Sequence, residues 1–302
     1  MSEAAQIPCA GADPPVVRPN RQVGRPLRSV VVAALLCVVQ LPTELPSTKF
    51  SSGQDVQPYF DGWIHNADGT FDLVFGYFNR NWQEELAIPA GPDNSVEPGG
   101  ADRGQPTYFL PRRQGWAYRV RVPRDFGKQV VTWTITANGK TQKAYGELLP
   151  VEESTERIIM TRGNLNPGDD DPNTPPVVAI APVAAAPALD SPIRLTAAVS
   201  DDGLPKPRPV APTKTSAPSD ATAIQAQANS SAVARPRGLT VSWMQIRGPA
   251  RIRFEPAGAQ SVVNGKADVT ARFSQRGTYV VRATASDGAL STKADLTISV
   301  PD

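Results

Sequence analysis

The chain has 302 residues, with 23 glycines and 31 prolines, which leaves room for two domains with their own cores and disfavours long helices. Its formal net charge of +2 resides in residues 1–41, where four arginines face two acids, and the other 27 basic and 27 acidic residues balance. A nucleic-acid-binding protein needs a concentrated basic surface, so this distribution argues against a nucleic-acid partner.

The N-terminal segment carries an apolar run, VVVAALLCVVQL at residues 30–41, behind its arginines. Twelve residues are too few to cross a bilayer, which takes about 20, but they suit the core of an export signal. We predict that residues 1–41 direct export to the periplasm, cell surface or medium; a buried strand and a short anchor are the alternatives. Both cysteines, Cys9 and Cys37, lie here, so the mature chain would have neither a disulfide nor a transmembrane span. Residues 42–57 read as a flexible spacer.

Residues 58–162 are expected to form an aromatic-rich β-sandwich domain, with a related barrel as the alternative. The stretch DGWIHNADGTFDLVFGYFNRN reads as strand, turn and strand, and an Asn138-Gly139 turn joins two further strands. Period-two alternation predicts two rows of side chains, each on one face of its strand: Phe71, Leu73, Phe75 and Tyr77 in one strand, and Trp116, Tyr118, Val120 and Val122 in another.

This domain also holds the candidate ligand-binding residues. Of the 20 aromatic residues, 15 lie between Tyr59 and Tyr145, and most are expected to fill the core. Phe78, Trp82 and Trp116 are the ones expected to be exposed, where they could stack on a sugar. The polar segment 88–115 is either a recognition loop, with Arg103, Arg112 and Arg113 as its binding residues, or an ordered connection held by its own ion pairs.

An acidic, proline-rich linker is predicted at residues 163–176, since NLNPGDDDPNTPP offers nothing apolar to bury. A second β-sandwich is expected at residues 177–301, because seven segments show period-two alternation and would pack as two sheets. Residues 209–237, rich in Ala, Pro, Ser and Thr, interrupt it; we predict a disordered insertion, with a ligand-ordered arm as the alternative.

The stretches SDDGLP (200–205), LTVSWMQIRGPARIRF (239–254) and FSQRGTYVVRATASDGALSTKADLTISV (273–300) resemble the PKD-type immunoglobulin-like repeats of bacterial surface and secreted proteins. The resemblance covers about residues 175–301 and implies a spacer or binding module. By the geometry of such sandwiches, Trp243 would fill the core, Val281 would take the place of a cysteine, and Tyr279 could form a tyrosine corner.

Strand order also predicts a cluster of carboxylates. In an up-and-down sandwich the second and sixth strands end where the first begins, so the acids that follow or precede those strands should meet. They are Asp169, Asp170, Asp171, Asp201, Asp202 and Asp287. Calcium takes six to eight oxygen ligands and could be bound there. The alternative is that these acids only shape Asp-Gly turns and stay solvated.

The inventory of reactive groups disfavours an enzyme. His65 is the only histidine, and no nucleophile elbow, phosphate-binding loop or dinucleotide fingerprint occurs. We therefore predict an all-β, exported, non-enzymatic protein of the cell envelope or medium, with a protein or glycan partner, that serves adhesion, binding or structure. The alternatives are a carbohydrate-binding accessory protein that uses the first-domain aromatics and, less favoured, a glycoside hydrolase with paired carboxylates.

Overall fold

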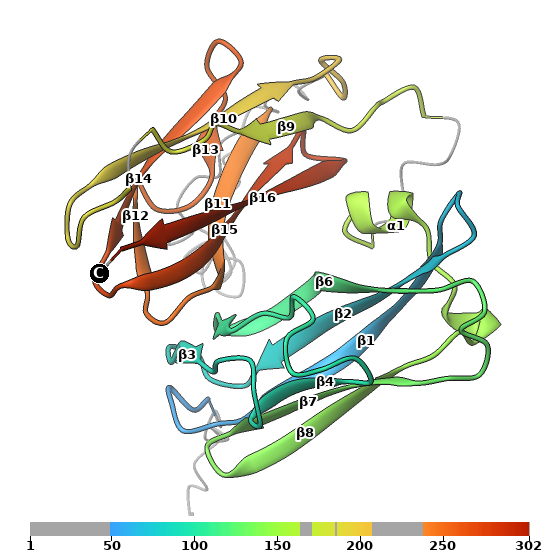
Figure 1. The fold of residues 1–302 in the computed structure, drawn as a ribbon. Helices are drawn as coiled ribbons and strands as arrows, with labels where there is room; N and C mark the ends of the chain where they lie inside the picture. The colour runs from blue at the N-terminus through green and yellow to red at the C-terminus, as the bar shows by residue number, and fades with distance from the viewer. Residues whose placement is uncertain (1–48, 164–170, 185, 207–237, 302) are drawn as a thin grey trace, which may run out of the picture. The chain divides into compact units, whose positions relative to one another are not determined.

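A computed structural model describes residues 49–163, 171–184, 186–206 and 238–301 (Figure 1). The predicted export signal, residues 164–170 of the linker and the insertion at 209–237 lie outside these residues. Almost all regular structure is antiparallel strand, so the all-β prediction is confirmed. Among the described residues no helix has the length and apolar character to span a membrane.

The first sandwich consists of two three-stranded sheets, with strand orders β1-β2-β6 and β4-β7-β8, and a short β3-β5 pair (Figure 1). Two single-turn helices follow the last strand, and Thr155 caps the second by accepting a hydrogen bond from Ile158 N. The elements are β1 (Val56–His65), β2 (Phe71–Asn79), β3 (Leu86–Ala87), β4 (Asn94–Glu97), β5 (Tyr108–Phe109), β6 (Arg112–Val122), β7 (Val131–Ala137), β8 (Lys140–Gly146), η1 (Pro150–Glu152) and α1 (Glu156–Met160).

Both predicted hairpins are present. The turn between β1 and β2 is closed by bonds from Asn66 N to Thr70 O and from Gly69 N to Asn66 O, each 2.9 Å. Between β7 and β8, Asn138 and Gly139 adopt φ values of 49° and 75°. These left-handed conformations suit a two-residue hairpin turn and explain the Asn-Gly pair.

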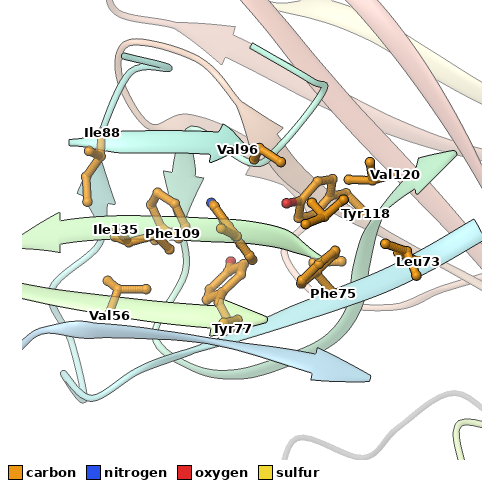
Figure 2. Packing of buried hydrophobic residues seen from close by; sticks show 14 of the residues in the cluster. Val56, Leu73, Phe75, Tyr77, Ile88, Val96, Phe109, Tyr118, Val120 and Ile135 are labelled. Atoms are coloured by element: carbon orange, nitrogen blue, oxygen red, sulfur yellow. The ribbon is translucent and has the colours of Figure 1, made fainter. Parts of the chain in front are cut away.

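The predicted row of β2 fills the first core. Leu73 and Phe75 are fully buried, and Phe75 stacks on Tyr118 of β6 with ring centroids 5.5 Å apart. Tyr118 in turn meets Trp133 edge to face at 4.8 Å. Figure 2 shows Phe75 and Tyr118 gathered with aliphatic side chains between the strands. Each such aromatic pair stabilises the fold by about 1 kcal/mol beyond the burial of its area.

The first sandwich begins earlier in the chain than expected. Strand β1 starts at Val56, two residues before the predicted boundary, and both Asp55 and Val56 are fully buried. Residues 50 and 51 already accept backbone hydrogen bonds from Trp82, Gln83 and Glu84. Lys49 to Gln57 therefore belong to the fold rather than to a spacer, because backbone pairing holds this polar segment where apolar periodicity is absent.

The second sandwich has two four-stranded sheets, with orders β12-β14-β10-β9 and β13-β11-β15-β16. All seven predicted strands are present, and the two-residue β13 is additional. The strands are β9 (Val177–Ile180), β10 (Ile193–Ser200), β11 (Thr240–Arg247), β12 (Ile252–Glu255), β13 (Gln260–Ser261), β14 (Lys266–Phe273), β15 (Gly277–Ser286) and β16 (Ser291–Val300).

Three residues singled out in the second sequence segment occupy core positions. Val281 and Tyr279 are fully buried, and Tyr279 OH donates a 2.7 Å hydrogen bond to Gln275 O, the upstream backbone bond of a tyrosine corner. Trp243 packs against both hydrophobic clusters of this sandwich, although it is only partly buried. These contacts are those of an immunoglobulin-like sandwich.

Candidate functional site

An aromatic–cation patch forms on the first sandwich at the end of its β1-β2-β6 sheet. We define it as Lys49, Phe50, Phe78, Trp82 and Arg112. Since the odd-numbered residues of β2 from Phe71 to Tyr77 face the core, Phe78 points to the opposite face, where it pairs in register with Arg113. The next pair in the ladder, Asn79 and Arg112, places Arg112 at the start of β6, with a φ of 67°.

The patch alternates aromatic rings and cations. The guanidinium carbon of Arg112 lies 4.6 Å from the ring centroid of Phe78 and 4.4 Å from that of Trp82. Lys49 Nζ lies 4.6 Å from the Trp82 ring. Trp82 N donates a 3.0 Å bond to Phe50 O, so two aromatic residues that are 43% and 52% exposed are neighbours along paired backbone. The predicted exposure of Trp82 is confirmed.

The charges of this patch are uncompensated within the described part of the chain. Neither Lys49 nor Arg112 has a carboxylate within ion-pair distance there. A cation held over a ring face is oriented by the ring quadrupole and still has hydrogen-bond donors to offer. Two oriented cations beside exposed aromatic carbon therefore present a surface complementary to an anionic ligand.

Arg113 lies next to the patch but is already paired. Its Nε donates a 3.1 Å bond to Tyr59 OH, its guanidinium covers the Tyr59 ring, and its Nη2 lies 3.6 Å from Asp61 Oδ1. Burial, followed by the nearby Asp61 charge, raises the pKa of Tyr59 to about 12. Burial also raises the pKa of Asp61, against the opposing effects of the Trp116 N–H and of Arg113.

Trp116 is not part of this surface. The alternation in WAYRVRV predicts Trp116 on the same face as Tyr118 and Ala117 on the other, yet Ala117 and Tyr118 both enter the core. Trp116 has a φ of 50°, and its N–H donates a 2.6 Å bond to Asp61 Oδ2. This left-handed residue shifts the register of β6, and its side chain packs against a satellite cluster that includes Ile159. Trp116 was predicted to be exposed and is only partly exposed.

The segment 88–115 is an ordered connection. Arg103 donates to Pro98 O at 2.7 Å and to Arg121 O at 3.3 Å, so its guanidinium is engaged by backbone carbonyls. The fully buried Asn94 donates to Ile88 O and Pro106 O and accepts from Trp133 Nε1. The segment is therefore held by hydrogen bonds from Arg103 and the buried amide of Asn94, whereas the sequence predicted ion pairs within the segment.

In the second sandwich, three of the six aspartates that strand order predicted to cluster act on one another through their charges: Asp201, Asp202 and Asp287. Asp287 is buried, and its Oδ2 accepts a 3.0 Å bond from Asn173 Nδ2. Burial raises the pKa of Asp201, and the charges of Asp287 and Asp202 raise it further. Asp171 accepts a 2.9 Å bond from Asn173 N. Asp169 and Asp170 lie outside the described residues.

The described residues contain no group of three or more His, Cys, Asp or Glu side chains arranged to hold a metal. Asp202 has other partners, since its Oδ2 accepts from Thr174 N and Oγ1 and its Oδ1 from Leu204 N. The bond from Leu204 N shapes the turn of Asp202 itself, as the turn-shaping alternative predicts, whereas the two bonds from Thr174 come from a segment 28 residues away in the chain.

Sequence reasoning missed Lys49 and Phe50 in the first sandwich and Asn173 in the second. The isolated Lys49-Phe50 pair in a polar stretch was a signal for the first site, but it fell within the predicted spacer. The predicted metal site consisted of carboxylates alone and did not include the amide of Asn173.

No family model and no curated protein matches this chain. Among solved structures, it is similar to a conjugative transposon lipoprotein from Bacteroides eggerthii DSM 20697, with 10% identity, coverage of 42% of this chain and 98% of the other, and a TM-score of 0.26. The D00-D0 domain of intimin gives 13% identity, 82% and 100% coverage and a TM-score of 0.26. The D0-D1 domain of intimin gives 12% identity, coverage of 80% of this chain and 97% of the other, and a TM-score of 0.23. At these TM-scores the likeness carries no argument about function, and the PKD-type resemblance stays a prediction.

Proposed function

We propose that this chain is an exported, non-enzymatic binding module of the cell envelope that recognises an anionic glycan through the aromatic–cation patch of its first sandwich. The observation that carries the proposal is the placement of Arg112 and Lys49 over the exposed ring of Trp82, without a carboxylate partner in the described chain. The apolar run at residues 30–41 supports export.

The arrangement favours an acidic sugar over a neutral one. A neutral sugar that stacks on Trp82 or Phe78 must compete with the cations that already cover those rings. The carboxylate of a uronic acid can instead pair with Arg112 through charge-assisted hydrogen bonds. The exposed edges of Trp82 and Phe50 then remain free to contact the carbon skeleton of the sugar.

Three largely buried carboxylates of the first sandwich are bound by other groups of the same sandwich, which supports a binding role over the hydrolase alternative. Asp72 accepts a 2.9 Å bond from Arg121, and Asp55 accepts a 2.7 Å bond from Gln142. Asp61 is bound by the Trp116 N–H, as described above. His65 is exposed and packs its ring against Phe71, with centroids 5.1 Å apart.

Polygalacturonate and its methyl-esterified form provide a matched pair of probes, since they share a backbone and differ in charge. We expect the chain to bind the acidic polymer, with an affinity that falls as salt rises, and to bind the ester at least tenfold more weakly. Arg112→Gln and Trp82→Ala should each weaken binding about tenfold, because each removes a charge-assisted or cation–π contact of roughly 1.4 kcal/mol. Calorimetric titration measures these affinities.

Two matched variants test whether general charge or hydrophobicity accounts for binding. Tyr145 is 57% exposed on β8, and Arg253 is exposed on β12, so Tyr145→Ala and Arg253→Gln remove the same kinds of group elsewhere. Both should bind the acidic polymer within twofold of the parent chain. Equal binding of the two polymers, or equal losses in all four variants, would refute recognition by the patch.

A further inference from the structure

Two buried oxygen atoms at the acidic cluster of the second sandwich have no hydrogen-bond partner among the described residues. They are Asp201 Oδ1 and Asn173 Oδ1, and Asn173 is only 3% exposed. A buried acceptor without a donor destabilises a fold, and such groups are rare in native proteins. Both atoms accept hydrogen bonds or bind cations and cannot donate.

Both orphaned oxygens belong to side chains that interact with Asp287. Asn173 Nδ2 donates to Asp287 Oδ2 at 3.0 Å, so the Oδ1 atom of the same amide lies beside that carboxylate. The negative charge of Asp287 acts on Asp201 and raises its pKa, after the larger effect of burial. Asp287 Oδ1 is occupied by the N–H groups of Ala289 and Leu290, whereas Oδ2 accepts one bond and keeps a lone pair.

Residue placement explains why these groups meet. Strand β9 pairs antiparallel with β10, so that Val177 lies opposite Ser200, and the chain before β9 meets the chain after β10. Asp201 follows β10 directly, Asp287 follows β15, and Asn173 stands four residues before β9. Asp171 fixes the backbone of Asn173 through a 2.9 Å bond. The oxygen atoms of Asn173, Asp201 and Asp287 thus come from three separate segments of the chain.

We infer that Asn173, Asp201 and Asp287 form a calcium site, with Asn173 Oδ1, Asp201 Oδ1 and Asp287 Oδ2 as its protein ligands. Calcium accepts amide and carboxylate oxygens in flexible geometry and completes its shell with water. Two carboxylates balance its charge, and a single ion satisfies both orphaned acceptors. With so few charged ligands, we expect the dissociation constant of extracellular modules, roughly 0.1 to 1 mM. Asp202 is excluded, because its oxygens are taken by Thr174 and Leu204.

Calorimetric titration of the whole chain with calcium chloride, and melting in calcium and then in excess chelator, tests the site. We expect saturable binding of one ion and a melting temperature that rises in calcium and returns in chelator. Magnesium chloride at equal ionic strength should have less than a third of the effect, because magnesium demands strict octahedral geometry. An unmoved melting temperature with no heat up to about 10 mM calcium, the result expected if water fills the site, would overturn the inference.

Asp201→Asn and Asp202→Asn form a matched pair of neighbouring charge deletions. Asp201→Asn should weaken calcium binding at least tenfold, and Asp202→Asn should stay within threefold of the parent, since only the first residue provides a ligand. Equal weakening in both variants, or an equal effect of magnesium, would show simple screening of the acidic cluster and would refute the site.

A third variant keeps the test decisive if Asp201→Asn does not fold. Asn173→Asp adds a carboxylate at the same position, and affinity for calcium rises with ligand charge. It should bind calcium about tenfold more tightly and melt lower than the parent in chelator, because three carboxylates then repel one another. Unchanged or weaker binding by a folded Asn173→Asp variant would contradict the assignment of its Oδ1 as a ligand.

Discussion

Buried amide side chains hold the irregular parts of the first sandwich. Asn79, Asn81, Asn94 and Gln105 are all fully buried. Asn79 donates to Glu84 O and Phe109 O, while Gln105 donates to Asn94 O. An amide can donate and accept at once, so one side chain replaces the backbone partners that an irregular segment lacks. These residues therefore do for loops what strand ladders do for sheets.

Asn94 offers the most direct test of this role. Asn94→Ala would leave Trp133 Nε1 and the carbonyls of Ile88 and Pro106 without their partner. We expect the free energy of unfolding to fall by about 3 kcal/mol, measured by chemical denaturation. The neighbouring Ser95→Ala, which removes a partly exposed hydroxyl, should stay within about 0.5 kcal/mol of the parent. Similar stabilities of the two variants would show that Asn94 is dispensable.

At the scale of elements, strand β1 depends on close backbone approach at one glycine. Its pairing with β2 shifts register between Phe60 and Gly62, and Ser154 N donates a 2.8 Å bond to Trp63 O on the other edge. Gly62 has a φ of 107°, and a Cβ atom there would lie 2.5 Å from Glu152 O. The strand can thus contact the segment at η1 only where a side chain is missing.

Gly62→Ala should therefore lower the free energy of unfolding by more than backbone strain alone would. The clash with a backbone oxygen and the unfavourable φ together predict a loss of about 3 kcal/mol in the free energy of unfolding. Gly53, with a φ of 79° and open space around its Cα, isolates the strain, so Gly53→Ala should lose about 1 kcal/mol. If urea titrations gave equal losses for both variants, close approach at Gly62 would not matter.

The sequence predicts elements whose pattern is local and misses those fixed by distant contacts. Alternation in FDLVFGYFN was sufficient to predict β2, and the Asn138-Gly139 pair was sufficient to predict the β7–β8 hairpin. Side-chain period and turn geometry are properties of short segments. The face of Trp116 was mispredicted, since its register shift depends on Asp61, 55 residues away in the chain. No local pattern encodes that bond.

The candidate sites follow the same division. Antiparallel strand order was enough to predict that Asp202 and Asp287 act on Asp201, since strand ends follow from strand number. The sequence could not show which carboxylate oxygens lack a hydrogen-bond donor. Asp202 has donors because Thr174 and Leu204 lie within bonding distance, and no local pattern encodes the bond from Thr174. In the first sandwich, Arg103 and Arg112 look alike in the sequence and differ only in what surrounds them.

At the scale of the whole chain, the hydrophobic residues gather in separate clusters. In the described residues, the large aromatic cluster of the first sandwich is formed by residues from Val56 to Leu148 only. The two clusters around Trp243 are formed by residues from Val178 onward. The predicted domain boundary at residues 163–176 falls between these sets. Separate cores can unfold as separate cooperative units, which makes the boundary a prediction about stability.

A matched pair of conservative substitutions tests whether the two cores unfold independently. Ile135 in β7 is fully buried in the first core, and Ile298 in β16 is 2% exposed in the second. Replacement of either by Val should cost about 1 kcal/mol, which lowers the melting temperature of a domain of this size by roughly 5 °C. Scanning calorimetry of the parent should show two transitions, with Ile135→Val lowering one and Ile298→Val lowering the other. A single transition lowered by both variants would mean that the sandwiches form one cooperative unit, and the boundary would then separate regions of sequence and not units of folding.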